Sequence, residues 1–299
     1  MNSIPDSERA VDASAYRREA ETPEIPNGVC SLTDQTLFDL LSEASPSAQA
    51  TSTPDRNIGF GFLYYSLGRI LRPKLAVVLG SKMGFSAVSM ALAIRDNLES
   101  GELILVDAAY DDNADGADAG MGGVGFWRDG DRVEELLQRF GVADVMTVKI
   151  MSTVDFAELH IEQKLPAIDL LLIDADHSYT GFKTDFETYA ELVQDAGVIL
   201  CHDSEVQDGY AGYSFGVGKY LREVVMTSDR FEAMSLPVWP GLGIVRKTGS
   251  IGDGGRVAPV VLQRVLQTSH DWLPLPVSQR ERLRDAVLRY LRILFPNSY

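Results

Sequence analysis

Two groups of acidic and imidazole side chains each follow an apolar run in the second half of the chain. The first group is Asp174, Asp176 and His177, and the second is the adjacent pair His202 and Asp203. Carboxylate oxygens suit Mg²⁺, and imidazole nitrogens extend the choice toward Mn²⁺, Fe²⁺ or Zn²⁺. The sequence therefore predicts that Asp174, His202 and Asp203 hold one divalent cation. The alternative is that His202 and Asp203 cap a loop and bind no metal.

Such a cation would give the neighbouring groups a defined chemistry. A bound cation lowers the pKa of a coordinated hydroxyl and so generates an alkoxide or phenolate near neutral pH. His177 lies three residues after Asp174. Because an imidazole titrates near neutral pH, we expect His177 to take the proton. Asp174 and His177 are thus the predicted catalytic residues.

A second candidate site is the glycine turn that follows the apolar run 75–79. Glycines let the backbone turn sharply and approach a ligand, and the helix that follows offers free N–H groups. The spacing is G-x-x-x-G and not the G-x-G-x-x-G of dinucleotide-binding proteins, which argues against NAD. A structural strand-to-helix turn without a ligand is the alternative. The candidate ligand-binding residues of this turn are Gly80, Ser81, Gly84 and Ser86.

Asp107 ends the next apolar run, 23 residues after Gly84. A carboxylate at this position accepts hydrogen bonds from both hydroxyls of a ribose. A solvated aspartate at the end of a strand would have the same sequence pattern. Together with the glycine turn, Asp107 predicts a site for a nucleoside-containing cofactor.

The loop 108–130 is long and rich in glycine and aspartate. Loops of this length are often functional, and we expect a mobile lid in which Phe126 and Trp127 cover a ligand. The residues from Asp111 onward match the first positions of a calcium-binding loop. The match ends at Gly122, where such a loop needs a bidentate glutamate. Calcium binding is therefore the weaker alternative.

These candidates need a scaffold that brings strand ends together. Apolar runs alternate with helical patterns from about residue 58, which indicates parallel strands joined by helical crossovers. Right-handed crossovers give a Rossmann-like, doubly wound α/β sheet, mostly parallel and seven-stranded. The expected strands are 75–79, 103–107, 145–150, 168–173, 197–201, 231–236 and 242–246, the last two forming an antiparallel closing hairpin. The expected helices are 86–98, 131–140, 182–195 and 216–226, with Asp131 and Glu134 as a capping box for the second.

Three segments follow from this pattern. Residues 1–56 form a polar N-terminal segment with a short helix at 31–44 and a linker, 57–248 form the α/β domain, and 249–299 form a helical tail. The tail helix, capped by Ser278 and Glu281, is rich in arginine. We expect it to pack on the acidic body of the protein or on a second subunit, which would make a homo-oligomer. A helix that lies on a membrane surface is the alternative.

Composition excludes several classes of protein. The chain has 299 residues, is 45% hydrophobic and carries a net charge of −16, which argues against nucleic acid and against an anionic membrane surface as partners. No apolar run reaches the ~18–20 residues of a membrane span, and the polar N-terminus has no signal core. The two cysteines, Cys30 and Cys201, match no zinc spacing. A cytoplasmic location is expected.

Taken together, these residues resemble the class I S-adenosylmethionine (SAM)-dependent methyltransferases. The resemblance covers about residues 58–248 and is closest to the branch of macrolide O-methyltransferases and cephalosporin hydroxylase-like proteins. Its most specific part is IDADHSYTGFKTDFETYAELVQDAGVILCHD at 173–203, and FGVGKYLREVV at 215–225 is also similar to this branch. It implies a metal-assisted transfer of a methyl group from SAM to a hydroxyl of a small molecule, with Mg²⁺ as the expected ion and secondary metabolism as the expected setting.

The resemblance also implies roles for individual residues. Asp174 would bind metal, together with the pair His202-Asp203, and His177 would be the base. The sequence departs from the family pattern at Val78, where an acidic residue is common, at Lys82 inside the glycine turn, and at His202, where relatives carry a carboxylate or an amide. The implied cofactor contacts are Gly80, Ser81 and Gly84 to the methionine and ribose, Asp107 to the ribose, and Asp176 to SAM.

Two other functions remain open at this point. One is a nicotinamide-dependent oxidoreductase on the same fold, against which the missing G-x-G-x-x-G counts. The other is a catalytically silent methyltransferase-like protein that uses the fold for binding, which Val78 favours and the acidic residues at the strand ends disfavour.

Overall fold

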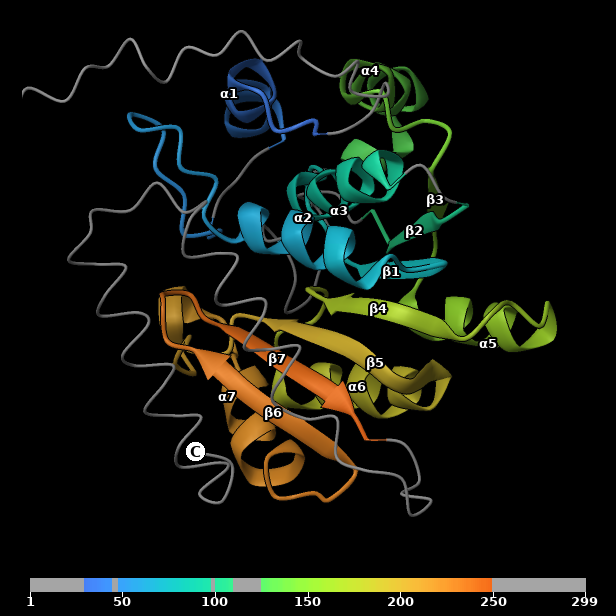
Figure 1. The fold of residues 1–299 in the computed structure, drawn as a ribbon. Coiled ribbons are helices and arrows are strands. Elements are labelled where there is room, and N and C mark those ends of the chain that lie inside the picture. Colours follow the sequence, from blue (N-terminus) through green and yellow to red (C-terminus); the bar gives the residue numbers. More distant parts are fainter. Residues whose placement is uncertain (1–29, 45–47, 98–99, 110–124, 249–299) are drawn as a thin grey trace, which may run out of the picture.

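The computed structural model describes residues 30–44, 48–97, 100–109 and 125–248, and in these it shows a seven-stranded sheet between two layers of helices (Figure 1). The strand order is β3-β2-β1-β4-β5-β7-β6. Strands β1 to β5 pair in parallel, and β7 pairs antiparallel with both β5 and β6. The strands are β1 (Leu75–Leu79), β2 (Glu102–Asp107), β3 (Met146–Ile150), β4 (Ile168–Ile173), β5 (Val193–His202), β6 (Phe231–Leu236) and β7 (Leu242–Lys247).

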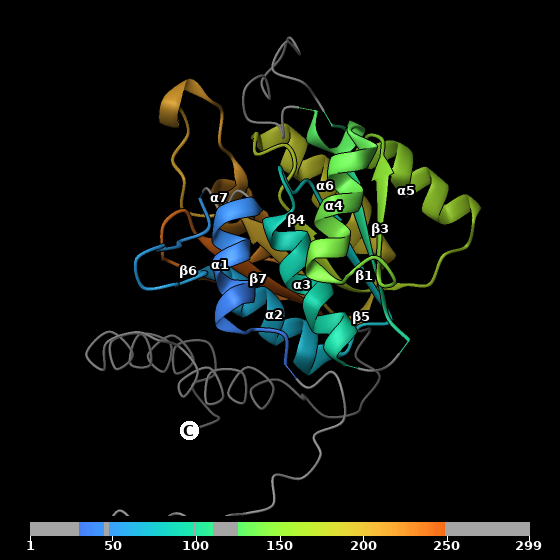
Figure 2. The ribbon, with the colours of Figure 1, turned by 90° about the horizontal axis from the view of Figure 1, so that it is seen from above.

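Helices cover both faces of the sheet, as Figure 2 shows from above. The central strands are apolar on both sides, and successive residues of β1 alternate between two cores. Val78 lies in the core beneath α1 to α4, and Val77 lies in the core beneath α5 to α7. The helices are α1 (Asp34–Glu43), α2 (Phe60–Leu71), α3 (Phe85–Asp96), α4 (Gly130–Phe140), α5 (Thr153–Glu162), α6 (Tyr179–Leu192) and α7 (Val217–Tyr220), with short turns at η2 (Phe126–Arg128), η3 (Tyr210–Gly212) and η4 (Leu221–Val225).

The predicted fold class is confirmed, including the antiparallel hairpin of β6 and β7. The predicted capping box of α4 is wrong. The helix begins earlier, at Gly130, and the side chain of Asp129 accepts the hydrogen bond from the backbone N–H of Arg132. Asp131 lies within the first turn, where its charge still favours the helix N-terminus.

Two helices were not predicted. Helix α2 is apolar around most of its circumference, and its N-cap Gly59 has no side chain to accept a capping hydrogen bond, so neither periodicity nor a cap marks its start. Helix α5 was missed although it has a clear cap, in which the Ser152 hydroxyl accepts a hydrogen bond from the backbone N–H of Asp155. It lies in the connection between β3 and β4. Predicted elements on 1–29 and in the 249–299 tail, and the calcium-like start of the loop at 111–122, lie outside the described residues.

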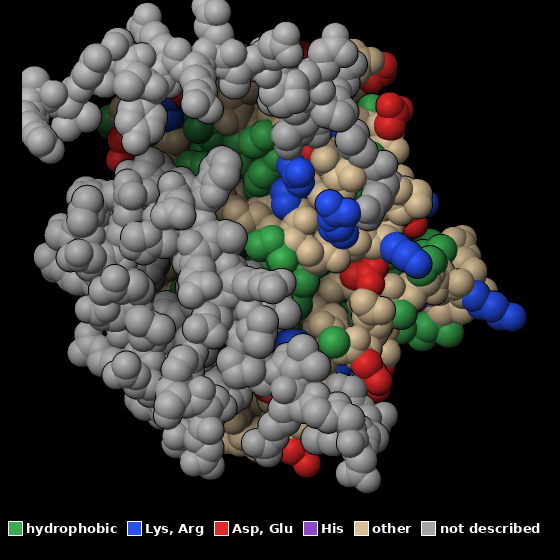
Figure 3. Space-filling model, in the orientation of Figure 1, with side chains coloured by type: hydrophobic (Ala, Val, Ile, Leu, Met, Phe, Trp, Pro, Cys, Tyr) green, Lys and Arg blue, Asp and Glu red, His purple; other side chains and the backbone are tan. Residues whose placement is uncertain are grey.

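Within the described residues, no helix has the length and apolar character needed to cross a bilayer. On the face shown in Figure 3, the described Lys and Arg side chains are interspersed with Asp and Glu. No His side chain is visible there. Of the histidines in the predicted site, His202 is buried, with only 2% of its surface exposed, and the side chain of His177 is 15% exposed.

Candidate metal centre and ligand crevice

The carboxyl ends of four adjacent strands form one edge of the sheet. In the order β2-β1-β4-β5 these strands end at Asp107, just before Gly80, just before Asp174, and at His202. The connections from β1 and β4 lead to opposite sides of the sheet, since β2 lies on one flank and β5 on the other. An open α/β sheet binds its ligands at such a reversal point. The topology therefore brings both predicted sites to one edge of the sheet.

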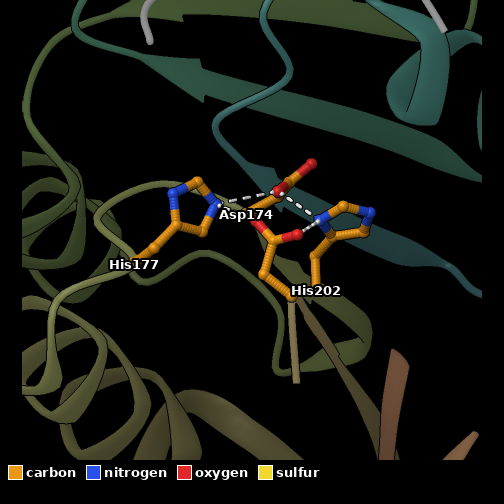
Figure 4. A group of neighbouring side chains, drawn as sticks. Asp174, His177 and His202 are labelled. Carbon is orange, nitrogen blue, oxygen red and sulfur yellow. Dashed lines mark hydrogen bonds and ion pairs between the residues drawn. The ribbon is translucent and has the colours of Figure 1, made fainter. Parts of the chain in front are cut away.

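Four side chains converge at this edge, as Figure 4 shows with the rings of His177 and His202 on opposite sides of Asp174. The Nε2 atom of His177 lies 3.2 Å from Asp174 Oδ1 and 2.9 Å from Asp203 Oδ2. The Nδ1 atom of His202 lies 3.0 Å from Asp174 Oδ1 and 3.2 Å from Asp203 Oδ1. One ligand atom from each residue falls within 4.8 Å of all the others. We call these four residues the Asp/His cluster.

The spacing in the Asp/His cluster fits a divalent cation. Ligand atoms bound at about 2.1 Å to one ion lie about 3.0–3.4 Å apart across neighbouring positions. In addition, both ring nitrogens of the buried His202 lack a hydrogen bond of good geometry within the described part of the chain: Nδ1 lies close to Asp174 and Asp203 without such a bond, and Nε2 has no partner there. Buried polar atoms normally have partners, so a cation near Nδ1 would satisfy one of the two. With the imidazole of His202 beside the two carboxylates, the predicted donor set suits Mn²⁺, Fe²⁺ or Zn²⁺ at least as well as Mg²⁺.

Backbone geometry fixes the two carboxylates. The N–H of Asp174 donates to the carbonyl of Leu79 at 2.8 Å, which ties the end of β4 to the end of β1. Asp203 has a φ of +59°, in the left-handed region. Aspartate tolerates this region better than most residues, and strained backbone of this kind gathers at functional sites.

Charge interactions inside the Asp/His cluster shift the pKa of each member. Burial alone would lower the pKa of His177, but its contacts with Asp174 and Asp203 outweigh burial and raise that pKa to about 10. The same two carboxylates raise the pKa of His202 against the effect of burial. Burial would raise the pKa of Asp174 and of Asp203, yet the two imidazoles hold both pKa values below the ordinary range. The two carboxylates and the two imidazoles thus favour one another's charged forms.

Aromatic side chains close the Asp/His cluster on two sides. The ring of Phe60, at the start of α2, meets the ring of His202 edge-on with centroids 6.0 Å apart. The ring of Phe215 stacks on His177 at 5.5 Å and 30°. Tyr64, one turn after Phe60, is fully buried, and burial together with the charges of Asp174 and Asp203 raises its pKa. The side chains of Asp174 and Asp203 keep only 13% and 9% of their surface exposed, and low exposure to water strengthens electrostatic interactions.

The glycine turn has the geometry expected of a ligand-binding turn, and part of it also serves the fold. Gly80 has a φ of +73°, and a Cβ there would lie 2.4 Å from the carbonyl oxygen of Asp174. Gly84, with a φ of +101°, begins α3. The hydroxyls of Ser81 and Ser86 are buried and bond to each other at 2.8 Å. In this structure the two hydroxyls are thus paired with each other, and the predicted contacts of Ser81 and Ser86 with a ligand stay predictions.

Asp107 is oriented by its own turn. Its Oδ2 accepts from the N–H of Ser81 at 3.2 Å, and its Oδ1 accepts from the N–H of Ala109 at 2.7 Å. Burial raises its pKa, those two hydrogen bonds lower it, and the nearby charge of Asp174 raises it further. A carboxylate has about four lone-pair positions, so two remain for the hydroxyls of a ribose.

Asp176 lies farther along the same turn. Its Oδ1 accepts from the N–H of Ser178 at 2.8 Å, and its carboxylate packs where a side chain on Gly181 would otherwise lie. The structure thus uses Asp176 at the start of α6. Its predicted contact with a cofactor stays a prediction.

Phe126 and Trp127 do not form an open lid in the described structure. Both are buried, and the ring of Trp127 packs where a Cβ on Gly84 would contact it. They are therefore part of the core between α3 and α4. The segment 110–124, which holds most of the predicted lid, lies outside the described residues.

Sequence reasoning missed the aromatic residues around the Asp/His cluster. Phe60 and Tyr64 are one helical turn apart in an unpredicted helix, and the buried side chain of Gln49 accepts a hydrogen bond from the Tyr64 hydroxyl at 3.0 Å. The i, i+4 spacing of the two rings was the available signal. No sequence spacing connects Phe215 with His177, because only the tertiary fold brings the two rings together.

Comparisons with known proteins agree with this description. Residues 77–204 match the profile of a family described as "Methyltransferase domain". A curated relative, the uncharacterized protein y4gI of Sinorhizobium fredii, is 27% identical over 186 residues, which make up 62% of this chain and 18% of that protein. The chain thus spans less than a fifth of the length of this relative.

Two solved structures have the same fold. The O-methyltransferase of Bacillus cereus, in complex with SAH, has a TM-score of 0.52 and 16% identity over 72% of this chain and 92% of that chain. The O-methyltransferase TomG of Streptomyces achromogenes, involved in tomaymycin synthesis and in complex with SAM, has a TM-score of 0.50 and 16% identity over 72% and 89%. With the family profile, they confirm the predicted resemblance to class I SAM-dependent methyltransferases.

Proposed function

We propose that this methyltransferase-domain chain transfers the methyl group of SAM to a hydroxyl of a small molecule, with a divalent cation held by the Asp/His cluster. One observation carries the proposal. The edge of the sheet that presents Gly80 and Asp107 also presents Asp174, His177, His202 and Asp203. The proposed nucleoside-binding turn and the Asp/His cluster thus lie at the same edge of the sheet, as a methyl donor and its acceptor require.

In SAM the methyl group is bound to a positively charged sulfur. The acceptor oxygen attacks the methyl carbon in line with the C–S bond, that bond breaks, and the neutral thioether SAH leaves. Alignment and exclusion of water therefore account for most of the acceleration. Asp107 fixes the ribose, because its carboxylate is already held by the N–H groups of Ser81 and Ala109. Gly80 and Gly84 let the backbone approach the rest of the donor.

A divalent cation at the Asp/His cluster lowers the pKa of an acceptor hydroxyl that binds to it. Asp174, His202 and Asp203 are its proposed ligands, since His202 is almost fully buried and faces both carboxylates. His177 is the proposed base. Its side chain is more exposed than that of His202, at 15% against 2%, so His177 lies nearer the side from which an acceptor enters.

The two carboxylates raise the pKa of His177 to about 10. A cation held by Asp174 and Asp203 would offset the negative charge that causes this rise. The proposed proton acceptor of His177 is Nε2, the nitrogen that faces the Asp/His cluster. The rings of Phe60 and Phe215 exclude water from the same region.

The two alternative functions have weaker support. A nicotinamide site lacks G-x-G-x-x-G, and the family profile over 77–204 is that of a methyltransferase domain. A silent binding protein would need neither the Asp/His cluster nor an oriented Asp107. Val78, the departure that favours such a protein, is a buried core residue of β1. We place the enzyme in the cytoplasm, with a small-molecule acceptor and no nucleic acid or membrane partner, on the sequence grounds given above.

Binding and turnover together test the proposal. Calorimetry of the full chain should show binding of SAM and of Mn²⁺ or Mg²⁺, and no comparable binding of NAD⁺ or NADP⁺. A mass-spectrometric screen of hydroxylated metabolites should find a product heavier by one methyl group, formed only with SAM and reduced by EDTA. Binding of NAD⁺ in preference to SAM would overturn the proposal. Turnover unaffected by EDTA would contradict the proposed role of a divalent cation.

A further inference from the structure

Three aromatic rings lead from the Asp/His cluster to the surface. Phe215 stacks on His177 at 5.5 Å, Tyr210 meets Phe215 at 6.3 Å, and Trp239 meets Tyr210 at 5.8 Å, all between ring centroids. Phe215 is buried, with 8% of its surface exposed, whereas Tyr210 and Trp239 are 52% and 53% exposed. We call Phe215, Tyr210 and Trp239 the aromatic ladder.

The exposed end of the aromatic ladder is unusual for a surface. Val238, next to Trp239, is also 45% exposed, so three large apolar side chains reach solvent together. Scattered apolar residues need no explanation, but adjoining ones mark binding surfaces. Tyrosine and tryptophan are well suited to this role, since each offers a large rigid face with few rotatable bonds.

Hydrogen bonds hold the aromatic ladder in place. The N–H of Phe215 donates to Asp208 Oδ1 at 3.0 Å, and the N–H of Gly209 donates to the carbonyl of Tyr213 at 2.9 Å. The N–H of Gly216, next to Phe215, donates to the carbonyl of His177 at 2.7 Å, which fixes this loop to the Asp/His cluster. Figure 2 shows the loop that carries η3 projecting beyond the carboxyl edge of the sheet.

The hairpin that carries Trp239 is fixed to the same loop. The N–H of Glu205 donates to the carbonyl of Pro240 at 2.9 Å, and Glu205 Oε1 accepts from the Ser235 hydroxyl at 2.7 Å. A Cβ on Gly241 would lie 2.4 Å from Glu205 N, so the two segments are in close contact. The rings are therefore set in position before a ligand arrives, which reduces the entropy lost on binding.

We infer that the aromatic ladder is the binding site for the body of the acceptor, and that the acceptor is a hydroxylated molecule with a flat apolar body of two or more rings. The inference rests on the proposed function for the position of the reacting hydroxyl at the Asp/His cluster. From there, an acceptor must extend past Phe215 and Tyr210 to cover Trp239. A single-ring acceptor at the cluster is too short to reach that end.

A graded set of probes tests this inference without methyl transfer. Calorimetry of the full chain with Mn²⁺ would compare phenol, 2-naphthol and 7-hydroxyflavone, which have one, two and three rings. We expect affinity to rise about tenfold or more from phenol to 7-hydroxyflavone, as contacts with Tyr210 and Trp239 are added. Trp239→Ala should remove most of this rise and leave the affinity for phenol unchanged. Trp239→Phe should keep most of it.

Ile161→Ala is the matched control, because Ile161 is an apolar residue of α5 that is 63% exposed and lies away from the aromatic ladder. It should leave all three affinities unchanged, and all variants should keep the wild-type melting temperature. Equal affinities for the three probes, or an unchanged rise in Trp239→Ala, would overturn the inference. So would a change from dimer to monomer caused by Trp239→Ala in sedimentation, since the patch would then bind a second copy of the chain. Ring-dependent binding without turnover would support the aromatic ladder and count against the proposed function alone.

Discussion

His177 Nε2 lies 2.9 Å from Asp203 Oδ2, although the two residues follow different strands, β4 and β5. The contact joins the predicted base to one of the predicted metal ligands. It also means that the charge of Asp203 controls both the affinity for a cation and the protonation of His177. A substitution that removes this charge and keeps the shape of the side chain separates the two effects from folding.

Asp203→Asn should weaken binding of Mn²⁺ by about tenfold to a hundredfold, because an amide is a poorer ligand than a carboxylate and leaves the site with one negative charge less. Calorimetry would measure the affinity. Asp195→Asn is the control, since Asp195 is an exposed residue of the same strand. Unchanged Mn²⁺ affinity in Asp203→Asn would mean that the Asp/His cluster holds no metal through this residue.

Stability without metal should depend on pH in a defined direction. The pKa of His177 in the folded protein is raised to about 10. Its contribution to the free energy of unfolding is therefore fully present below the unfolded-state pKa of about 6.5 and is lost as pH rises toward 10. The pKa values of Asp174 and Asp203 are lowered, so their contribution is present above about pH 4 and is lost as pH falls. In EDTA, the stabilisation is greatest between about pH 4 and 6.5.

Urea unfolding in EDTA would measure this dependence. Between pH 6.5 and 10, the unfolding free energy of the wild type should fall by about 1–3 kcal/mol more than that of His177→Gln, which has no titrating imidazole at this position. His160→Gln is the control, because burial lowers the pKa of His160 and its Nε2 contacts only the carbonyl of Pro166. A parallel fall in the wild type and His177→Gln would show that His177 is not the group responsible.

Asp107→Asn should lower the affinity for SAM by about tenfold or more, as expected when a hydrogen bond to a charged group is replaced by one to a neutral group. The variant should fold, because the amide oxygen can keep one of the two backbone hydrogen bonds from Ser81 and Ala109. Asp144→Asn, at an exposed position before β3, is the control. Equal SAM affinity in all three proteins would remove Asp107 from the cofactor site.

The sequence was sufficient to predict the sheet and the residues at its carboxyl edge. Strand β1 and residues 170–173 of β4 are continuous apolar runs, and each run ends at a residue of another kind, at Gly80 and at Asp174. Their convergence then followed from parallel pairing alone. The residue types at the strand ends can therefore be predicted from the sequence alone.

The aromatic side chains around the Asp/His cluster could not be predicted from the sequence in the same way. Phe60 belongs to a helix without a side-chain cap, and Phe215 belongs to a loop, so no periodic pattern connects either ring with a histidine. The wrong cap of α4 has a similar cause, because Asp129 and Asp131 are both acidic and only the backbone conformation of Asp129 distinguishes them. Side-chain contacts of this kind depend on tertiary packing.

Gly80 provides a test of the turn that is independent of any ligand. Its φ of +73° is strained for other residues, and a Cβ would lie 2.4 Å from the carbonyl oxygen of Asp174 and 2.9 Å from Ala175 Cα. Both neighbours are backbone atoms, which cannot move aside without separating β1 from β4. Gly80→Ala should therefore lower the unfolding free energy by about 2–4 kcal/mol.

Gly130→Ala is the matched control, because a Cβ at Gly130 would meet no atom within 4 Å and the residue begins α4. It should be neutral or stabilising by up to about 1 kcal/mol. Since the same carbonyl belongs to Asp174, Gly80→Ala should also weaken Mn²⁺ binding, whereas Gly130→Ala should not. Urea unfolding and calorimetry of both variants would measure these effects. Equal stability of the two variants would contradict the close approach of β1 and β4 on which the shared crevice depends.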